Sequence, residues 1–478
     1  MRKIVIGFYK RAAVALFSFL ALFAMANAMA APARPNVLVV IADQWRFEAL
    51  GFAGNPDVKT PNLDRLAHES VRLETAVSGL PVCTPMRASF MTGQRPLTDG
   101  VFMNDVALNP NAETIAKVFR KAGYDTGYVG KWHLNGDGRS AFIPPERRQG
   151  FDYWKVLECT HDYNHSFYYA NDPVLREWEG YDAIAQTRDV ENYLRSRRGS
   201  AKPFFLVLAW GPPHSPYNTA PKKFRELYKP DQLSFRPNVP GAVRAKAGEM
   251  LAGYYAHCSA LDACLGGLWQ ALREAGLDKN TILLFTSDHG DMLGSHDLYR
   301  KQKPYDESIR VPLLVHWPAG LKPRFSGLDA PINSEDLMPT ILGLCRLPIP
   351  KSVQGKDFSR YLRGGRAPGD GSALITCIAP FGEWSRQKGG KEFRGLRTAR
   401  YTYCRDLHGA WLLFDDRVDP FQTNNLAGAP AAAKLVRKLD KALVKKLARE
   451  HDEFLSGDQY IQRFGYVVNS NGTVPYAR

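Results

Sequence analysis

The sequence lacks the features of a membrane protein, a repeat protein or a zinc protein. After residue 30, no apolar run in the 478 residues approaches the roughly 20 residues that a membrane-spanning helix needs. No period of about 20 to 50 residues repeats and no segment is of low complexity, which argues against solenoids and disordered scaffolds. The seven cysteines form no CxxC pair and no zinc-ligand spacing, and their odd number leaves at least one thiol unpaired.

The first thirty residues differ from the rest and have the pattern of an export signal. Their basic residues are Arg2, Lys3, Lys10 and Arg11. A short apolar run over 13–26 follows, and then small residues that fit a small-x-small cleavage site. The run is shorter than a typical membrane-spanning helix, so an uncleaved membrane anchor is the weaker alternative. We expect residues 1–30 to be a signal peptide and the mature protein to be exported, periplasmic or secreted, without stable membrane insertion.

Positive charge exceeds negative charge, with 63 Lys and Arg against 48 Asp and Glu and a net charge of +15. Only four of the basic residues belong to the leader, so the excess persists in the mature chain. Such an excess suits a polyanionic partner, either nucleic acid or an acidic polysaccharide. Because the basic residues are scattered and not gathered in a stripe with interleaved aromatics, we expect no nucleic-acid partner.

Four short apolar runs predict buried strands of a largely parallel sheet. They are residues 36–42, 124–130, 203–210 and 281–287, with helical patterns between them, for example over 112–122 and 248–275. The runs are followed by Asp43 and Gln44, by Lys131 and His133, by His214, and by Asp288 and His289. A single Asp or His after a strand is more often a helix cap or a turn residue. Four such strand ends indicate one converging site, because ligands gather at the carboxyl ends of parallel strands. The predicted fold class is α/β.

The run from Leu80 to Gly93 predicts a helix that begins at a reactive residue. Pro85 suits the first helical turn and Gly93 suits the helix exit, which places Cys83 at the helix N-terminus. Free N–H groups and the positive end of the dipole make that position an anion site. Arg87, one turn along, can direct its guanidinium to the same anion.

Cys83-Thr-Pro85-Met-Arg87, followed by Thr92-Gly93, resembles the Cys-x-Pro-x-Arg motif of type I, formylglycine-dependent sulfatases in the alkaline-phosphatase superfamily. The agreement continues through residues 60–67, 130–133, 286–290, 305–312, 336–340 and 414–426, and covers nearly all of the mature chain. It implies an alkaline-phosphatase-like domain with a large, mostly parallel central sheet flanked by helices, plus a small subdomain. We expect the catalytic sulfatase domain over 31–363. A Gly/Pro-rich linker begins the C-terminal subdomain over 364–478, which has hairpin and helix patterns that fit an antiparallel sheet with a packed helix.

The resemblance also implies a modified residue and a metal ion. A formylglycine-generating maturation enzyme would oxidise Cys83 to 3-oxoalanine (formylglycine), whose hydrated aldehyde is the nucleophile. Asp43, Gln44, Asp288 and His289, with modified residue 83, would hold one divalent ion, expected to be Ca²⁺. The family more often has Asp at position 44 and Asn at position 289. The lost carboxylate leaves other divalent metals possible.

Arg87 and Lys131 match the family's cations that bind sulfate oxygens. His133 matches the base that takes a proton from the hydrated aldehyde after sulfate transfer, the step that expels sulfate. Fixed cations of this kind stabilise charge that develops during transfer without rearrangement of solvent.

His214 and one lysine match the pair that contacts the leaving-group oxygen. The family's Lys-to-Arg spacing, counted back from Arg310, gives Lys301 and favours it over the nearby Lys303. The full set of expected catalytic residues is Cys83, Arg87, Lys131, His133, His214 and Lys301.

The expected function is hydrolysis of sulfate esters, on a sulfated carbohydrate. The loop over 159–165 could hydrogen-bond sugar hydroxyls, although a solvated loop is the favoured reading, and Trp384 and Arg386 are weaker candidates.

One alternative is a phosphonate monoester or phosphodiester hydrolase of the same superfamily, which can share the Gln44 and His289 pattern. Lys131-Trp-His133 argues against it. The other alternative is a non-catalytic binder of sulfated glycans, although none of the matched positions is missing.

Overall fold

A ten-stranded sheet forms the centre of the computed structural model, which describes residues 34–476. The predicted signal peptide lies outside these residues. The strands, in spatial order, are β12 (Arg324–Leu328), β2 (Val71–Leu73), β11 (Leu313–His316), β9 (Thr281–Ser287), β1 (Asn36–Asp43), β8 (Phe204–Pro213), β4 (Asp125–Lys131), β5 (Tyr153–Leu157), β6 (Phe167–Tyr169) and β7 (Leu175–Glu177). The α/β fold class predicted from the sequence is confirmed.

The five middle strands, from β9 to β5, run parallel to one another. In β1, Val39 pairs with Leu284 of β9 on one side and with Val207 of β8 on the other. The four predicted strands are confirmed with shifts of a few residues at their ends. They appear in the sequence as continuous apolar runs because both faces of a parallel sheet are covered.

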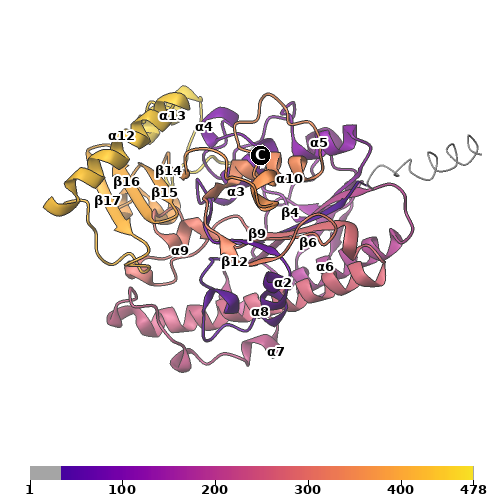
Figure 1. The fold of residues 1–478 in the computed structure, drawn as a ribbon. Coiled ribbons are helices and arrows are strands. Elements are labelled where there is room, and N and C mark those ends of the chain that lie inside the picture. Colours follow the sequence, from indigo (N-terminus) through magenta and orange to yellow (C-terminus); the bar gives the residue numbers. More distant parts are fainter. Residues whose placement is uncertain (1–33, 477–478) are drawn as a thin grey trace, which may run out of the picture. The chain divides into compact units, whose positions relative to one another are not determined.

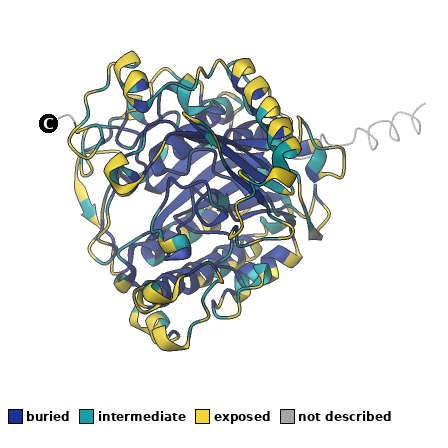
Figure 2. Ribbon diagram, turned by 90° about the vertical axis from the view of Figure 1, so that its left-hand side faces the viewer, coloured by how far each residue is buried: buried dark blue, intermediate teal, exposed yellow. Residues whose placement is uncertain are grey.

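Helices cover both faces of the sheet (Figure 1). On one face lie α2 (Pro61–His68), α6 (Asp182–Ser196) and α8 (Arg244–Glu274); on the other lie α3 (Cys83–Thr92), α5 (Ile115–Lys121) and α10 (Leu337–Leu344). Alternate residues of β1 face opposite cores: Val39 packs with α3 and α5, and Val40 packs with α8. Figure 2 shows the sheet as the most deeply buried layer. Among residues 34–476, no helix is long and apolar enough to cross a bilayer.

A separate four-stranded antiparallel sheet lies in the C-terminal part of the chain. It consists of β14 (Ser372–Cys377), β15 (Phe393–Thr398), β16 (Tyr401–Asp406) and β17 (Gly409–Asp415). Helix α12 (Ala433–Arg449) packs Leu439, Leu443 and Leu447 on one face, and the other face contacts Val77 and Ile309 of the larger part. The sequence predicted the hairpin strands and α12, but not β14 or α13 (Gly457–Arg463). The domain boundary at residues 363 and 364 stays a prediction.

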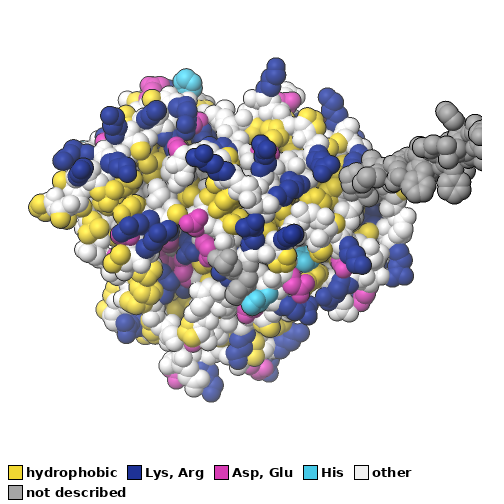
Figure 3. All heavy atoms as spheres, viewed as in Figure 1, with side chains coloured by type: hydrophobic (Ala, Val, Ile, Leu, Met, Phe, Trp, Pro, Cys, Tyr) yellow, Lys and Arg dark blue, Asp and Glu magenta, His cyan; other side chains and the backbone are white. Residues whose placement is uncertain are grey.

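Basic side chains are spread over the face shown in Figure 3, with acidic ones between them. No continuous basic stripe is visible on that face. On this face the basic residues are scattered, as the sequence suggested.

Candidate active site

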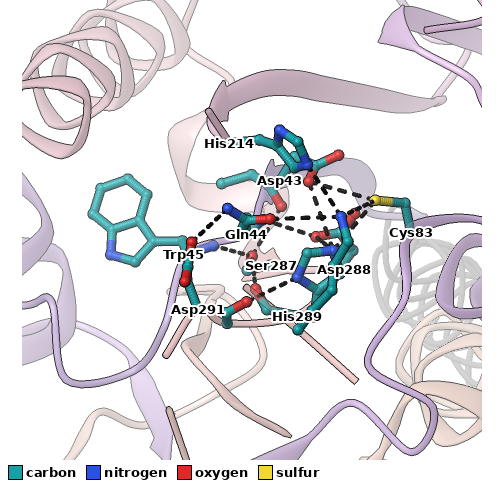
Figure 4. A network of polar contacts seen from close by, with 12 residues as sticks. Asp43, Gln44, Trp45, Cys83, His214, Ser287, Asp288, His289 and Asp291 are labelled. Atoms are coloured by element: carbon teal, nitrogen blue, oxygen red, sulfur yellow. Dashed lines mark hydrogen bonds and ion pairs between the residues drawn. The ribbon is translucent and has the colours of Figure 1, made fainter. Parts of the chain in front are cut away.

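The carboxyl ends of four parallel strands bring their polar residues to one buried place (Figure 4). Asp43, the last residue of β1, lies at its centre. Its Oδ2 accepts hydrogen bonds from Lys131 Nζ at 2.6 Å and from Arg87 Nη2 at 3.2 Å. Its Oδ1 lies 3.7 Å from Cys83 Sγ. Burial alone raises the pKa of Asp43, but the positive charges of Lys131, Arg87 and Lys301 hold it well below its ordinary value.

Cys83 is the first residue of α3, as the sequence predicted. Gly93 ends this helix in the left-handed conformation, with a φ of 65°. The Cys83 sulfur lies 3.2 Å from His289 Nε2 and 3.2 Å from Lys301 Nζ. Burial and Asp43 each raise the pKa of the Cys83 thiol. The positive charges around it outweigh them and lower that pKa well below its ordinary value.

Ligand atoms of Asp43, Cys83, Asp288 and His289 all lie within 4.8 Å of one another, and all four residues are buried. Burial and the neighbouring carboxylate of Asp43 raise the pKa of Asp288 to about 6. Two carboxylates crowded in this way favour a bound cation that neutralises both. The oxygen and imidazole donors therefore fit a divalent metal ion.

The side-chain oxygen of Gln44 points toward this cluster because its amide nitrogen is hydrogen-bonded on the opposite side. Its Nε2 donates to Asp291 Oδ2 at 2.6 Å and to the Tyr217 hydroxyl at 3.2 Å. Its Oε1 then accepts from Lys301 Nζ at 3.5 Å. Asp291 is fully buried and also accepts backbone N–H groups of Leu293 and Arg300. Asp291 was not predicted from the sequence, although its place three residues after Asp288 was a signal.

Arg87 lies between the two carboxylates of the cluster. Its Nη2 is 3.2 Å from Asp43 Oδ2 and 3.2 Å from Asp288 Oδ2, while its Nη1 donates to the Lys131 carbonyl at 2.9 Å. The guanidinium is almost wholly buried, so these contacts hold it in one orientation.

His133 belongs to a chain of hydrogen bonds that was not predicted from the sequence. Its Nε2 lies 2.8 Å from Asp105 Oδ1, which also accepts from the Tyr476 hydroxyl at 2.5 Å. Arg139 Nε donates to the same hydroxyl at 2.7 Å. Burial raises the pKa of Asp105, but the bonds from His133 and Tyr476 outweigh it and lower the pKa. The last described residues of the chain thus reach the candidate site.

Lys301 and His214 form a pair on the other side of Cys83. Lys301 Nζ lies 3.1 Å from His214 Nε2, and the His214 ring stacks on His161 with centroids 4.7 Å apart. Burial and the Lys301 charge hold the pKa of His214 well below its ordinary value, so its ring is neutral. Lys303 instead donates to the Tyr299 carbonyl at 2.6 Å. Of the two lysines that the sequence left as rivals, only Lys301 contacts Cys83 among the described residues.

A cavity of about 410 Å³ opens onto these residues. Of the loop over 159–165, Cys159 and His161 line it, whereas the His165 side chain is exposed. Burial raises the pKa of the Cys159 thiol, but Lys131, His133 and His161 lower it to about 6. Asn471 and Thr473 of the C-terminal segment also line the cavity. Arg386 does not, because it pairs with Glu392 and Asp458.

Two family models match the chain. A model described as Sulfatase matches residues 35–347, and a model described as N-sulphoglucosamine sulphohydrolase, C-terminal, matches residues 294–449. The first match alone covers more than half of the chain. It includes all the site residues that lie at the ends of the four parallel strands.

Known proteins similar to the chain carry the same family name. An "Ulvan-active sulfatase" of Formosa agariphila is 44% identical over 93% of this chain and 87% of its own. An "Endo-4-O-sulfatase" of Bacteroides thetaiotaomicron is 34% identical over 82% of this chain and 88% of its own. The solved structure of the putative sulfatase yidJ from Bacteroides fragilis superposes with a TM-score of 0.80 at 30% identity, covering 91% of this chain and 99% of that one.

Proposed function

The chain belongs to the sulfatase family and is a sulfuric ester hydrolase, and we propose that it desulfates a carbohydrate with a formylglycine made from Cys83. One observation carries the proposal. The side chain of residue 83 lies between metal-type donors, His289 and Asp43, and the ammonium group of Lys301. A nucleophile must be activated by a metal or a base, and a nearby positive charge must stabilise the negative charge that develops on the leaving group.

Formylglycine and the bound cation would together supply an activated hydroxyl nucleophile at position 83. The residues proposed to hold the cation are Asp43, Gln44, Asp288 and His289, together with residue 83. Three of the protein side chains offer oxygen, which favours Ca²⁺. The His289 imidazole leaves room for a softer divalent ion. Conversion of Cys83 would require the maturation enzyme.

Arg87 and Lys131 are assigned to the sulfate oxygens and to negative charge at residue 83. Both are already fixed by buried contacts, so they need no rearrangement when charge develops. His133 is assigned as the base at residue 83. Asp105 accepts from its Nε2, so Nδ1 is the ring nitrogen left to exchange a proton with residue 83. Burial lowers the pKa of His133, but Cys159, the bond to Asp105 and the Cys83 thiol raise it to about 10, and conversion of Cys83 to formylglycine removes one of these causes.

Lys301 and His214 are assigned to the leaving-group oxygen. His214 is neutral and its Nε2 accepts from the Lys301 ammonium, so Lys301 is the proton donor of the pair. The positive charge also stabilises the departing alkoxide before the proton arrives.

The proposed substrate class is a sulfated carbohydrate. Two relatives named above are a sulfatase active on ulvan and an endo-4-O-sulfatase. Without the four basic residues of the predicted leader, the chain still carries more Lys and Arg than Asp and Glu, an excess that suits a polyanionic substrate. The signal-peptide pattern of residues 1–30 supports export, where such polysaccharides are encountered.

The second candidate is a phosphonate monoester hydrolase, which the Gln44 and His289 pair favours. The test compares kcat/KM of the formylglycine-bearing enzyme for an aryl sulfate and for an aryl phosphonate monoester with the same phenol. We expect the sulfate to be the better substrate by at least about tenfold. A preference for the phosphonate ester would establish the second candidate. Turnover of neither ester and of no sulfated oligosaccharide, with residue 83 fully converted, would favour the non-catalytic glycan binder.

A further inference from the structure

A second cavity, of about 670 Å³, lies beside the one that opens onto Cys83. Glu383 and Lys388 line both cavities, so the two share a wall. Two other chain segments also pass from one to the other. His214 lines the first cavity and Ser215 the second, while Lys301 lines the first and Arg300 the second.

The shared border coincides with the leaving-group side of the proposed reaction. Lys301 and His214 are the residues assigned to the oxygen that stays with the sugar. The sugar attached to that oxygen extends away from the sulfate, past these two residues. The second cavity begins on the far side of the same two segments, and its volume is in the range of sites that bind molecules larger than one sugar.

The wall of the second cavity carries more positive than negative charge. Its cations are Lys246, Arg300, Lys303 and Lys388, and its acids are Asp297 and Glu383. Two ammonium groups are held over aromatic rings, Lys246 at 4.3 Å from the Tyr299 centroid and Lys303 at 5.2 Å from the Trp384 centroid. Arg300 bonds to the Tyr217 hydroxyl through one nitrogen, Nη1, at 2.9 Å. Fixed cations in a hollow of this kind favour an anionic group.

We propose that the second cavity is a subsite for an acidic sugar linked to the sugar that loses its sulfate. This inference rests on the proposed function and deepens it: the substrate is an oligosaccharide or polysaccharide with adjacent anionic residues, not a single sulfated sugar. The anionic group is a uronate carboxylate or a second sulfate ester. Both are flat or tetrahedral oxyanions that lysine and arginine bind.

The test uses the full-length, formylglycine-bearing enzyme and four substrates. One is an aryl sulfate, which fills only the first cavity. Three are sulfated disaccharides that differ in the neighbouring sugar: a uronate, its carboxyl-reduced neutral form, and the neutral sugar with a second sulfate. We expect kcat/KM to be about fivefold to twentyfold higher for an acidic neighbour than for the neutral one. The better of the two acidic substrates identifies the source of the anion.

The test variant is the double substitution Lys246→Met and Lys388→Met. Both side chains are exposed, so folding is not at risk, and Met keeps most of the aliphatic stem. We expect the preference for an acidic neighbour to fall by about threefold or more, with a remainder due to Arg300 and Lys303. The matched control, Lys438→Met, removes an exposed lysine of α12 that lines neither cavity, and should keep the preference.

The outcomes separate the inference from the proposed function. If the enzyme hydrolyses aryl sulfate but shows no preference for an acidic neighbour, or if the double variant keeps the full preference, the subsite is wrong and the proposed function stands. If the converted enzyme hydrolyses none of the sulfate esters, the proposed function is wrong and the subsite falls with it.

Discussion

The ammonium nitrogen of Lys301 lies 3.2 Å from the sulfur of Cys83. These two residues are 218 positions apart in the chain and meet because the segment after β9 folds over the N-terminus of α3. The contact places a proton donor and a positive charge beside the residue proposed to become the nucleophile. It also distinguishes Lys301 from Lys303, whose ammonium bonds to the Tyr299 carbonyl.

Lys301→Met is expected to lower kcat/KM for a sugar sulfate by about 10² to 10⁴, because the leaving alkoxide loses its proton donor. The loss should shrink for aryl sulfates as the phenol becomes more acidic, since a good leaving group needs no proton. Steady-state kinetics over a series of aryl sulfates checks this dependence. Lys303→Met should lose at least about tenfold less on the sugar sulfate. Equal losses for the two variants would remove Lys301 from the assigned role.

Asp291→Asn is expected to weaken metal binding by about 10- to 100-fold, since Gln44 would no longer be held with its oxygen toward the cluster. Chelation should abolish wild-type activity and lower the unfolding temperature, and added Ca²⁺ should restore both. The measurement is the Ca²⁺ concentration that gives half-maximal recovery. Asp231→Asn, an exposed substitution, is the control and should match wild type. Identical Ca²⁺ dependence of Asp291→Asn and wild type would contradict the positioning role.

Tyr476→Phe is expected to lower kcat/KM about threefold to tenfold on every sulfate ester, because Asp105 loses a hydrogen bond that fixes it against His133. Tyr466→Phe is the matched control. It removes a hydroxyl of the same segment that bonds to the Gly100 carbonyl at 2.6 Å, remote from His133. Tyr466→Phe should show normal kinetics. If the two variants behave alike, the C-terminal segment has no specific role in orienting His133.

Alkylation of Cys159 is expected to inactivate the formylglycine-bearing enzyme, since this thiol lines the cavity. Its pKa of about 6 means that the reactive thiolate dominates above that pH and is lost as the pH falls through it. The inactivation rate with iodoacetamide should therefore be half-maximal near pH 6. Cys159→Ala should resist the reagent. A rate that rises only above pH 8 would show an ordinary, unperturbed thiol.

The sequence was sufficient for the parts of the site that follow from local chemistry. β1 and β9 are apolar runs; Asp43 ends the first and Asp288 directly follows the second, and both reach the site. Pro85 and Gly93 mark the two ends of α3, which placed Cys83 at its N-terminus. In both cases the signal lies within a dozen residues of the functional side chain.

The parts that the sequence could not supply depend on distant segments meeting. Tyr476 and Asp105 are 371 residues apart and lie in segments without periodicity, so nothing in the sequence indicated that they form a hydrogen bond. β14 was missed because the hairpin pattern begins only after the intervening loop of residues 378–392. The second cavity is formed by four separate segments, and no pattern along the chain brings them together.

The most direct test of the account is mass spectrometry of the tryptic peptide over residues 73–87, together with aryl-sulfate turnover. The protein is prepared with and without a co-expressed formylglycine-generating enzyme. The account predicts that the aldehyde replaces the Cys83 thiol only in the first preparation, and that activity rises in proportion to the converted fraction. Full activity in protein whose residue 83 is entirely unmodified cysteine would contradict it.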